Sequence, residues 1–334
     1  MDWQTWRDEL AGKPADIPEG RFEALAMEVF RFQARFNPLY LEYISLLGID
    51  VEKVEGVERI PFLPISLFKT HAIQTGEWAP ALRFSSSGTA GMLASSHLLK
   101  DPDWYLSNAR RCFSAFYGPP EHYCFLALLP SYLEREGSSL VFMAGHFIQN
   151  SPYKQSGFFL YDWNKLIRAL DECLEQKIPT VLLGVSFALL ELAENHPVSL
   201  PGVIVMETGG MKGRRRELTR EELHGILTGA FGVPAIHSEY GMTELLSQAY
   251  SRGDGRFYPP PSMRVYAREI TDPFSPAPPG RLGVLNIADL ANLDTCAFIA
   301  TDDLGKVYPD GSFEVLGRLD NSDIRGCNLL VAGY

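Results

Sequence analysis

The chain has 334 residues, 46% of them hydrophobic, and carries a formal net charge of −11. This composition supplies enough apolar material for one large domain or two smaller ones. The acidity disfavours nucleic acid as a partner, because phosphate neutralisation needs clustered Lys and Arg and the basic run at 212–216 is short.

Cysteine usage and apolar runs indicate the compartment. Five scattered cysteines without a Cys-x-x-Cys pair disfavour a zinc site and are typical of a reducing environment. The N-terminus lacks the charged and apolar regions of a signal peptide. The longest apolar run, 181–190, is shorter than the about 20 residues that a membrane span needs. The sequence therefore predicts a cytoplasmic protein with no transmembrane segment.

The first part of the chain predicts helices followed by extended structure. Apolar residues at three- and four-residue spacing predict helix over 19–47, interrupted at Asn37-Pro38. Two prolines within the apolar stretch 60–69 predict an extended connector. A short strand at 81–84 is then expected to lead into a Ser/Gly-rich loop.

Between 101 and 256, helices and strands alternate. The strands are near-continuous apolar runs, which is typical of parallel sheets covered on both faces. The predicted strands are 123–129, 139–144, 180–183 and 202–206. The predicted helices are 102–116, 163–176, 186–193 and 220–230, the last opened by a capping box over Thr219–Glu222.

Residues 257–334 are rich in Pro and Gly, with short strand-like pieces and a hairpin signal at Asp310-Gly311. They predict a β-rich module packed on the α/β core. Four regions are therefore expected: a helical N-terminal region packed on the core over 1–75, an α/β nucleotide- and acyl-binding core over 76–256, a β-rich module over 257–318, and a short tail over 319–334.

Three stretches carry candidate chemistry, of which the first is the hydroxyl-rich loop at 85–91. Its glycines can bring backbone N–H groups close to phosphate oxygens, because no Cβ stands in the way. It is not a Walker A motif, since no Gly-Lys-Ser/Thr follows. Taken alone, such a Ser/Gly run more often is a flexible surface loop.

The second stretch, 237–244, places an aromatic ring, a glycine, a hydroxyl and a carboxylate within five residues. Tyr240 could stack on a base, Thr243 could bond a phosphate oxygen, and Glu244 could hold Mg²⁺ through oxygen. A turn followed by a capped helix start would explain the same residues.

The third stretch, 301–305, is followed by a Gly-Arg-Leu-Asp run at 317–320. Asp303 follows a predicted strand, where a carboxylate could accept hydrogen bonds from ribose hydroxyls. Taken alone, Asp303 is only a turn residue.

Together and in this order, the stretches resemble the adenylate-forming superfamily of acyl-CoA synthetases, peptide adenylation domains and luciferases. The Tyr-Gly-x-Thr-Glu element of that superfamily is matched in full by 240–244, and its phosphate loop by 86–91. Its Thr-Gly-Asp-Leu-Gly element corresponds to 301–305, and its Gly-Arg-x-Asp hinge to 317–320. The resemblance covers nearly all of the chain after the N-terminal helices.

The resemblance implies the α/β large N-terminal domain of an adenylate-forming enzyme: stacked parallel and mixed sheets, covering helices and a β-rich module. Two departures are evident. The Pro-Lys pair that follows the family's phosphate loop is absent. The sequence also stops soon after the hinge, at Tyr334, so the family's mobile C-terminal domain and its catalytic lysine are not expected.

Within the superfamily, the chain resembles the acyl-protein synthetase branch, the long-chain-fatty-acid–protein ligases. In that branch a cysteine near the C-terminus receives the acyl group, which points to Cys327. The resemblance implies ATP and Mg²⁺ as cofactors and a fatty or other carboxylic acid as substrate. It also implies an acyl-CoA reductase or a carrier protein as partner.

The resemblance assigns roles residue by residue. Glu244 would hold the metal and Thr243 a phosphate. Some other cation must replace the missing lysine, or the adenylation step is slow, and Lys212 and Lys69 are weak candidates for it. His237 is a candidate base for the Cys327 thiol, whose alternative is a buried structural cysteine. The residues expected to bind the nucleotide are Ser86, Ser87, Gly88, Thr89, Gly91, Gly209, Gly210, Tyr240 and Gly241, with Asp303 and Arg318 at the ribose.

Two other functions remain open at this point. The protein could pass an acyl or aryl adenylate to CoA or a carrier protein without using Cys327. It could instead be a catalytically degenerate subunit that only binds nucleotide.

Overall fold

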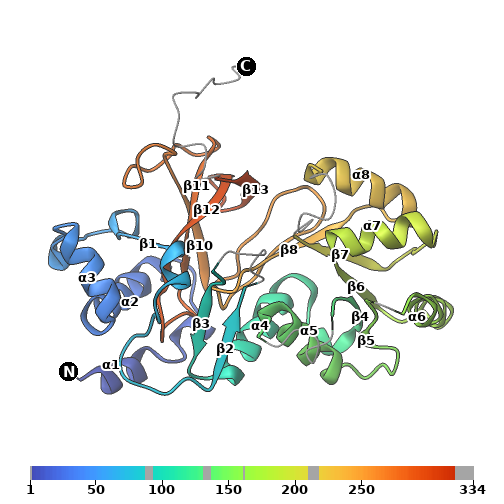
Figure 1. Cartoon of the computed structure of the whole chain (residues 1–334), viewed down its shortest axis with the longest axis horizontal. Coiled ribbons are helices and arrows are strands. Elements are labelled where there is room, and N and C mark those ends of the chain that lie inside the picture. Colours follow the sequence, from blue (N-terminus) through green and yellow to red (C-terminus); the bar gives the residue numbers. More distant parts are fainter. Residues whose placement is uncertain (1, 87–92, 131–136, 161, 210–217, 320–334) are drawn as a thin grey trace.

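The computed structural model describes residues 2–86, 93–130, 137–160, 162–209 and 218–319 (Figure 1). These residues form two sheets with their covering helices, joined by a small β-hairpin. Within them, no helix combines the length and the apolar character needed to cross a membrane.

The larger sheet has six strands in the order β5-β4-β6-β7-β8-β9. The strands from β5 to β8 are parallel, and β9 pairs antiparallel with β8. Its strands are β4 (Cys124–Leu128), β5 (Gly157–Phe158), β6 (Thr180–Val185), β7 (Ile204–Thr208), β8 (His237–Tyr240) and β9 (Ala249–Ser251). The expectation of a mostly parallel sheet is confirmed.

Helices cover both faces of this sheet. Side chains of a strand alternate between the faces: His237 of β8 bonds Tyr117 of α4, whereas Ser238 contacts His224 of α8. Figure 1 shows α4 and α5 on one side of the sheet and α7 and α8 on the other. The helices are α4 (Pro102–Tyr117), α5 (Ser139–Asn150), α6 (Trp163–Glu175), α7 (Ser186–Asn195) and α8 (Arg220–Phe231).

The second sheet has five strands in the order β1-β12-β11-β10, with β13 beside β12. All pairings are antiparallel except that of β1 with β12. Its strands are β1 (Leu63–Pro64), β10 (Met263–Arg268), β11 (Gly283–Asp289), β12 (Phe298–Val307) and β13 (Phe313–Arg318).

The N-terminal helices lie beside the second sheet in Figure 1 and share its hydrophobic core. They are α1 (Trp3–Leu10), α2 (Phe22–Phe36) and α3 (Pro38–Leu46). The hairpin of β2 (Leu82–Ser85) and β3 (Ser96–Leu99) connects this part of the chain to α4. Short 3₁₀ helices complete the described elements: η1 (Lys13–Ala15), η2 (Val51–Lys53), η3 (Val57–Arg59), η4 (Ile65–Lys69) and η5 (Pro120–His122).

Two hydrophobic cores result, and the chain passes from the first to the second along strand β8. The first core fills the space around the six-stranded sheet and its helices, and it includes Ile236, just before β8. Tyr240, at the end of β8, lies in the second core with Phe257 and Phe313. The last residue of β8 therefore joins the two halves of the molecule. One half is built around the six-stranded sheet, and the other around the five-stranded sheet and the N-terminal helices.

Two expectations about local structure were wrong. Residues 139–144 start helix α5 rather than a strand, because the Ser138 hydroxyl caps the helix by accepting the N–H of Val141 at 3.4 Å. Residues 60–69 are not simply extended, since they contain the two-residue strand β1 and the 3₁₀ helix η4.

Packing alone accounts for the glycine of the 301–305 stretch, Gly305. The pairing of β12 with β13 shifts register between Leu304 and Gly305. A Cβ at Gly305 would collide with the backbone carbonyl oxygen of Glu314 and lie 3.0 Å from Leu285 Cδ1.

We expect Gly305→Ala to lower the free energy of unfolding by about 1–3 kcal/mol, because β13 must move to admit the methyl group. Gly317→Ala is the matched control: apart from its chain neighbours, no atom of the described residues lies within 4 Å of its added Cβ, and it should stay within about 0.5 kcal/mol of wild type. Urea denaturation of both variants measures the difference, and equal stabilities would contradict the packing argument.

Candidate functional site

The β2–β3 hairpin carries the first motif. The Ser95 N–H donates to Ser86 Oγ at 2.8 Å, and the Ser86 N–H donates to the Ser95 carbonyl at 3.1 Å. The Ser85 N–H also donates to the carbonyl of Gly137 at 2.7 Å. These bonds fix Ser86 at the neck of the loop, with its hydroxyl proton still able to donate.

The structure brings Tyr240 and Asp303 together. The Tyr240 hydroxyl donates to Asp303 Oδ2 at 2.8 Å, across 63 residues of sequence. Burial, and then the charge of Asp303, raises the pKa of the Tyr240 hydroxyl well above its usual range. Burial also raises the pKa of the Asp303 carboxyl, although the Tyr240 hydroxyl opposes this. The Tyr240 ring is buried against Phe313, so its predicted stacking on a base stays a prediction.

Charged groups gather around this pair. Arg318 lies opposite Asp303 in the β12–β13 pairing, with Arg318 Nε 3.8 Å from Asp303 Oδ1. The Arg318 side chain is 67% exposed, so it can reach a bound ligand. Burial raises the pKa of the nearby Glu244 carboxyl, and a hydrogen bond from Ser95 and the charge of Arg318 lower it in part. The structure thus assembles the hairpin, Glu244, Asp303 and Arg318 into one site.

The backbone that carries Thr243 and Glu244 is held by side chains from elsewhere. His97 Nδ1 lies 2.8 Å from the Thr243 carbonyl oxygen. Asn292 Nδ2 donates to the Glu244 carbonyl at 2.8 Å. Two consecutive carbonyls of the second motif therefore have partners on β3 and on the connection between β11 and β12.

Asp289 fixes the next part of the same loop. This fully buried carboxylate accepts the N–H groups of Leu246 at 2.8 Å and Ser247 at 2.9 Å. It also accepts the Ser247 hydroxyl at 2.6 Å. Burial raises the pKa of Asp289, against the lowering effect of these hydrogen bonds.

Sequence reasoning missed this supporting set of His97, Asp289, Asn292 and Thr295. A usable signal existed for three of them: they are polar residues in and beside the short connection between two apolar strands, 283–289 and 298–307. Buried polar side chains need hydrogen-bond partners, and here those partners are the motif backbone.

The other candidate residues lie as follows. Gly209 directly follows β7 and is exposed. Gly241 follows β8, and a Cβ there would collide with the Glu239 carboxylate, which would have to move to admit it. Lys69 is exposed at the end of η4. Ser87, Gly88, Thr89, Gly91, Gly210, Lys212 and Cys327 lie outside the described residues, and their roles remain predictions.

His237 is not brought to the Tyr240–Asp303 pair. It starts β8, three residues before Tyr240, and points to the opposite face of the sheet. Its Nδ1 lies 3.0 Å from the Tyr117 hydroxyl. Burial, followed by the charge of Arg252, lowers the pKa of His237. Its role as a base for Cys327 stays a prediction that this placement does not favour.

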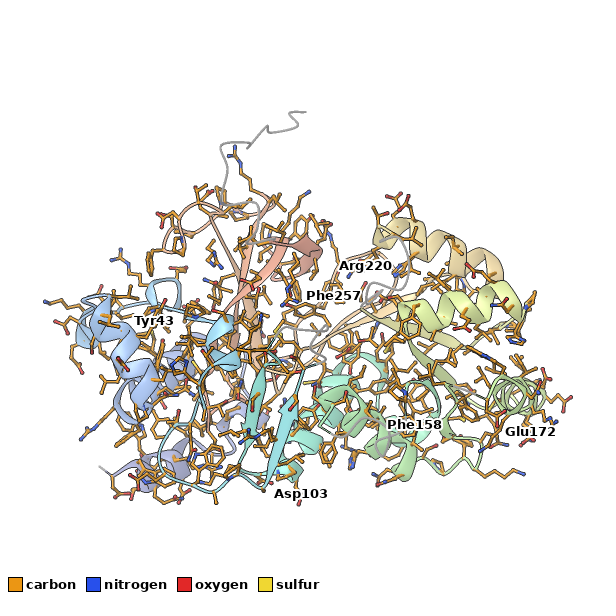
Figure 2. All side chains as sticks on the ribbon, in the orientation of Figure 1. Tyr43, Asp103, Phe158, Glu172, Arg220 and Phe257 are labelled. Carbon is orange, nitrogen blue, oxygen red and sulfur yellow. The ribbon has the colours of Figure 1, made fainter. Side chains whose placement is uncertain are left out.

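The start of helix α8 joins the two halves near this site. Figure 2 labels Arg220 and Phe257, and the Arg220 guanidinium carbon lies 4.8 Å from the centre of the Phe257 ring. Arg220 Nη1 donates to the Val315 carbonyl of β13 at 2.8 Å, and Nε lies 3.5 Å from Glu207 Oε1 of β7. The strand that carries Arg318 is therefore tied to the six-stranded sheet.

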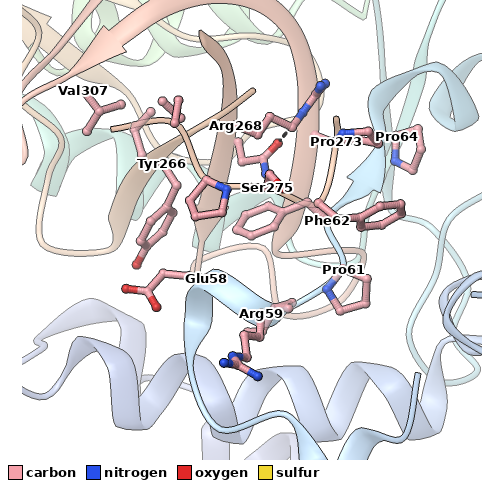
Figure 3. A pocket seen from close by; sticks show the side chains of 18 of the residues that line it. Glu58, Arg59, Pro61, Phe62, Pro64, Tyr266, Arg268, Pro273, Ser275 and Val307 are labelled. Carbon is pink, nitrogen blue, oxygen red and sulfur yellow. Dashed lines mark hydrogen bonds between the residues drawn. The ribbon is translucent and has the colours of Figure 1, made fainter. Parts of the chain in front are cut away.

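A separate groove of about 930 Å³ lies between residues 43–64 and the second sheet (Figure 3). Phe62, Tyr266 and several prolines line it, with Arg268 bonded to Asn286 Oδ1 at 3.0 Å. The lining includes Asp302 of the 301–305 stretch, but none of the candidate site residues that the structure describes. This groove is therefore distinct from the candidate nucleotide site.

Known proteins share the fold described above. No family model matches the chain. A long-chain-fatty-acid–luciferin-component ligase of Aliivibrio fischeri is 24% identical over 351 aligned positions, covering 93% of this chain and 87% of the relative. Among solved structures, a 2-hydroxyisobutyryl-CoA ligase with 2-HIB-AMP and CoA superposes with a TM-score of 0.64 at 13% identity, covering 92% of this chain and 72% of that one. ATP-bound MatB from Rhodopseudomonas palustris superposes with a TM-score of 0.52 at 20% identity.

The chain has the fold of the adenylate-forming ligases. It corresponds to their N-terminal part. The superposition with MatB covers 72% of this chain and 49%, about half, of MatB. In open α/β sheets, ligands are expected beyond the carboxyl ends of the parallel strands. Thr208 ends β7 and Tyr240 ends β8 at that edge, next to Gly209 and Gly241.

Proposed function

We propose that this protein activates a carboxylic acid, most simply a fatty acid, with ATP and then transfers the acyl group to a thiol. In the first step a carboxylate oxygen attacks the α-phosphorus of ATP, an acyl-adenylate forms and pyrophosphate leaves. In the second step a thiolate attacks the acyl carbonyl, a thioester forms and AMP leaves. The observation that carries the proposal is the junction of Tyr240, Asp303 and Arg318 beside Glu244.

The roles of the residues follow from their positions. Asp303 would accept the ribose hydroxyls, and the exposed Arg318 would contact the ribose or a phosphate. Ser86 and its loop would hold phosphate oxygens, together with Thr243. Positioning and charge neutralisation are the main contributions that a protein makes to such a reaction.

The proposed metal ion is Mg²⁺, with Glu244 as its protein ligand. Among the described residues, no three His, Cys, Asp or Glu side chains form a cluster that could hold a metal alone. One carboxylate nevertheless fits Mg²⁺, which commonly keeps several waters and takes further oxygens from substrate phosphates. Bound there, the ion would offset the negative charge of the phosphates.

Cys327 is the proposed acyl acceptor, and a partner such as an acyl-CoA reductase would then take the acyl group. The Aliivibrio fischeri relative is named as a long-chain-fatty-acid–luciferin-component ligase, which supports a fatty acid as the group that is transferred. The other four cysteines, at 112, 124, 173 and 296, are all buried and are poor candidates for the acceptor. CoA or a carrier protein is the alternative acceptor, which the likeness to a CoA ligase favours.

Intact-protein mass after incubation with MgATP and a panel of fatty and aromatic acids tests this function. We expect a hydroxylamine-labile acyl adduct on Cys327 in wild type and its loss in Cys327→Ser, while acid-dependent ATP–pyrophosphate exchange, which precedes thiol attack, persists.

The possible results separate the candidate functions. Exchange without any adduct, together with acyl-CoA formation in Cys327→Ser, would favour the CoA or carrier-protein acceptor. ATP binding with neither exchange nor adduct would favour a nucleotide-binding subunit. An adduct that maps to a buried cysteine would contradict the assignment of Cys327.

A further inference from the structure

The His97 side chain lies between the second motif and the connection between β11 and β12. It belongs to β3, directly after the hairpin loop, and only 1% of it is exposed. The Phe68 ring packs edge-on against its imidazole, with the ring centres 5.7 Å apart. A buried imidazole needs partners for both nitrogens, and the structure supplies them.

The two ring nitrogens of His97 have different hydrogen-bond partners. Nδ1 lies 2.8 Å from the Thr243 carbonyl oxygen, which can only accept, so Nδ1 carries a hydrogen and donates. Nε2 lies 2.9 Å from Thr295 Oγ1 and 3.1 Å from Asn292 Oδ1. Burial lowers the pKa of His97 to about 4, against the raising effect of these bonds, so the ring is neutral and Nε2 carries no hydrogen. The Thr295 hydroxyl, which also lies 2.5 Å from Asn292 Oδ1, can donate to either of these two acceptors.

Asn292 extends the contact to the next residue of the motif. Its side-chain N–H₂ donates to the Glu244 carbonyl at 2.8 Å, which also fixes the orientation of its amide. The Thr295 carbonyl accepts the Thr75 hydroxyl at 2.6 Å and the Asn37 amide at 2.9 Å. The partners of His97 are therefore anchored to the N-terminal helices.

We propose that His97 is a positioning residue for the adenylation step, acting through its Nδ1–H bond to the Thr243 carbonyl. The proposal rests on the function proposed above, in which Thr243 and Glu244 contact phosphate and metal. The bond ties these two residues to the hairpin that carries Ser86, and so sets the distance between the groups that face the phosphates. A misplacement of about 1 Å at such a site can cost about 100-fold in rate.

Two amide substitutions separate the nitrogens of His97. In His97→Asn, the short side chain can place its N–H₂ near the position of Nδ1 and keep the bond to Thr243. In His97→Gln, the longer side chain places its amide near the position of Nε2, toward Asn292 and Thr295. Both remove the ring and its packing on Phe68, so they are matched in what they lose from the core.

The measurement is acid-dependent ATP–pyrophosphate exchange, with kcat and the two KM values determined separately, and with thermal denaturation of each variant. We expect His97→Asn to keep kcat within about threefold of wild type. We expect His97→Gln to lower kcat by about 30- to 100-fold with the KM for the acid unchanged, because a displaced phosphate contact affects the reacting geometry.

The outcomes distinguish this proposal from the function on which it rests. If wild type gives no acid-dependent exchange, both are overturned. If wild type is active but the two variants have the same kcat, or both fall only in proportion to their thermal stability, His97 is structural and the positioning proposal alone is overturned.

Discussion

Replacing Asp303 with alanine is expected to lower kcat/KM for ATP in acid-dependent pyrophosphate exchange by about 100-fold. A hydrogen bond to a charged group contributes about 1.5–3 kcal/mol, and 1.36 kcal/mol corresponds to a tenfold change. Asp303 is placed to accept from ligand hydroxyls, and its side chain is 16% exposed beside Arg318. Its loss would also leave the buried Tyr240 hydroxyl without the acceptor that it has at 2.8 Å.

Tyr240→Phe is the control for that second effect. It removes the hydroxyl but keeps the ring, which packs against Phe257 and Phe313 at centre distances of 5.7 and 5.3 Å. We expect a loss of only a few fold, because Asp303 would still face the ligand and the core would stay filled. If Tyr240→Phe were as damaging as Asp303→Ala, the hydroxyl would be the more important group. If Asp303→Ala left the exchange unchanged, the nucleotide site would lie elsewhere.

Replacing Glu239 with glutamine is expected to remove a loss of stability that the wild type shows as pH rises from about 4.5 to about 7. Glu239 is buried beside Tyr240 and accepts the Thr208 hydroxyl at 2.7 Å. Burial raises the pKa of its carboxyl to about 7 from 4.5, although the Thr208 bond opposes this. Folding therefore favours the protonated form.

The sign follows from this pKa shift. Below pH about 4.5 the carboxyl is protonated in both states and ionisation costs nothing. Between about 4.5 and 7 the unfolded chain releases its proton while the folded protein holds it, so stability falls with rising pH by about 3 kcal/mol in total. Above about 7 the contribution is constant.

Urea denaturation of wild type and Glu239→Gln from pH 5 to 8 measures this effect. The glutamine can still accept the Thr208 hydroxyl, and its amide does not ionise, so the variant should gain stability relative to wild type as pH rises. Comparison within the pair cancels the other titrating groups. Parallel pH profiles for the two proteins would show that Glu239 is ionised in the folded protein.

Much of the alternation of helices and strands between 101 and 256 could be predicted because the longer elements have simple signals, whereas the short strands at 157–158, 237–240 and 249–251 were not predicted. The strand at Thr180–Val185 is a continuous buried run, and the helix after Thr219 begins with a capping box in which both reciprocal bonds are present. The run at 139–144 could not be assigned, because five consecutive apolar residues after a serine fit a buried strand and a buried helix equally. The cap at Ser138 decided it.

The site could be predicted as a set of residues, but not as a set of contacts. The three stretches identified Tyr240, Glu244, Asp303 and Arg318, and the structure brings these four together. Which atoms meet depends on pairing between elements far apart in the chain. His97 lies 146 residues from Thr243, and local periodicity carries no information about such a pair.

The position of Tyr240 ties ligand binding to the stability of the whole molecule. Its backbone belongs to the six-stranded sheet, its ring fills the core of the other half, and its hydroxyl meets the carboxylate that faces the proposed nucleotide. Separation of the two halves would therefore expose this ring and break that bond at once. A ligand that binds only the intact site is linked to folding by mass action, and its binding energy would stabilise both halves as one cooperative unit.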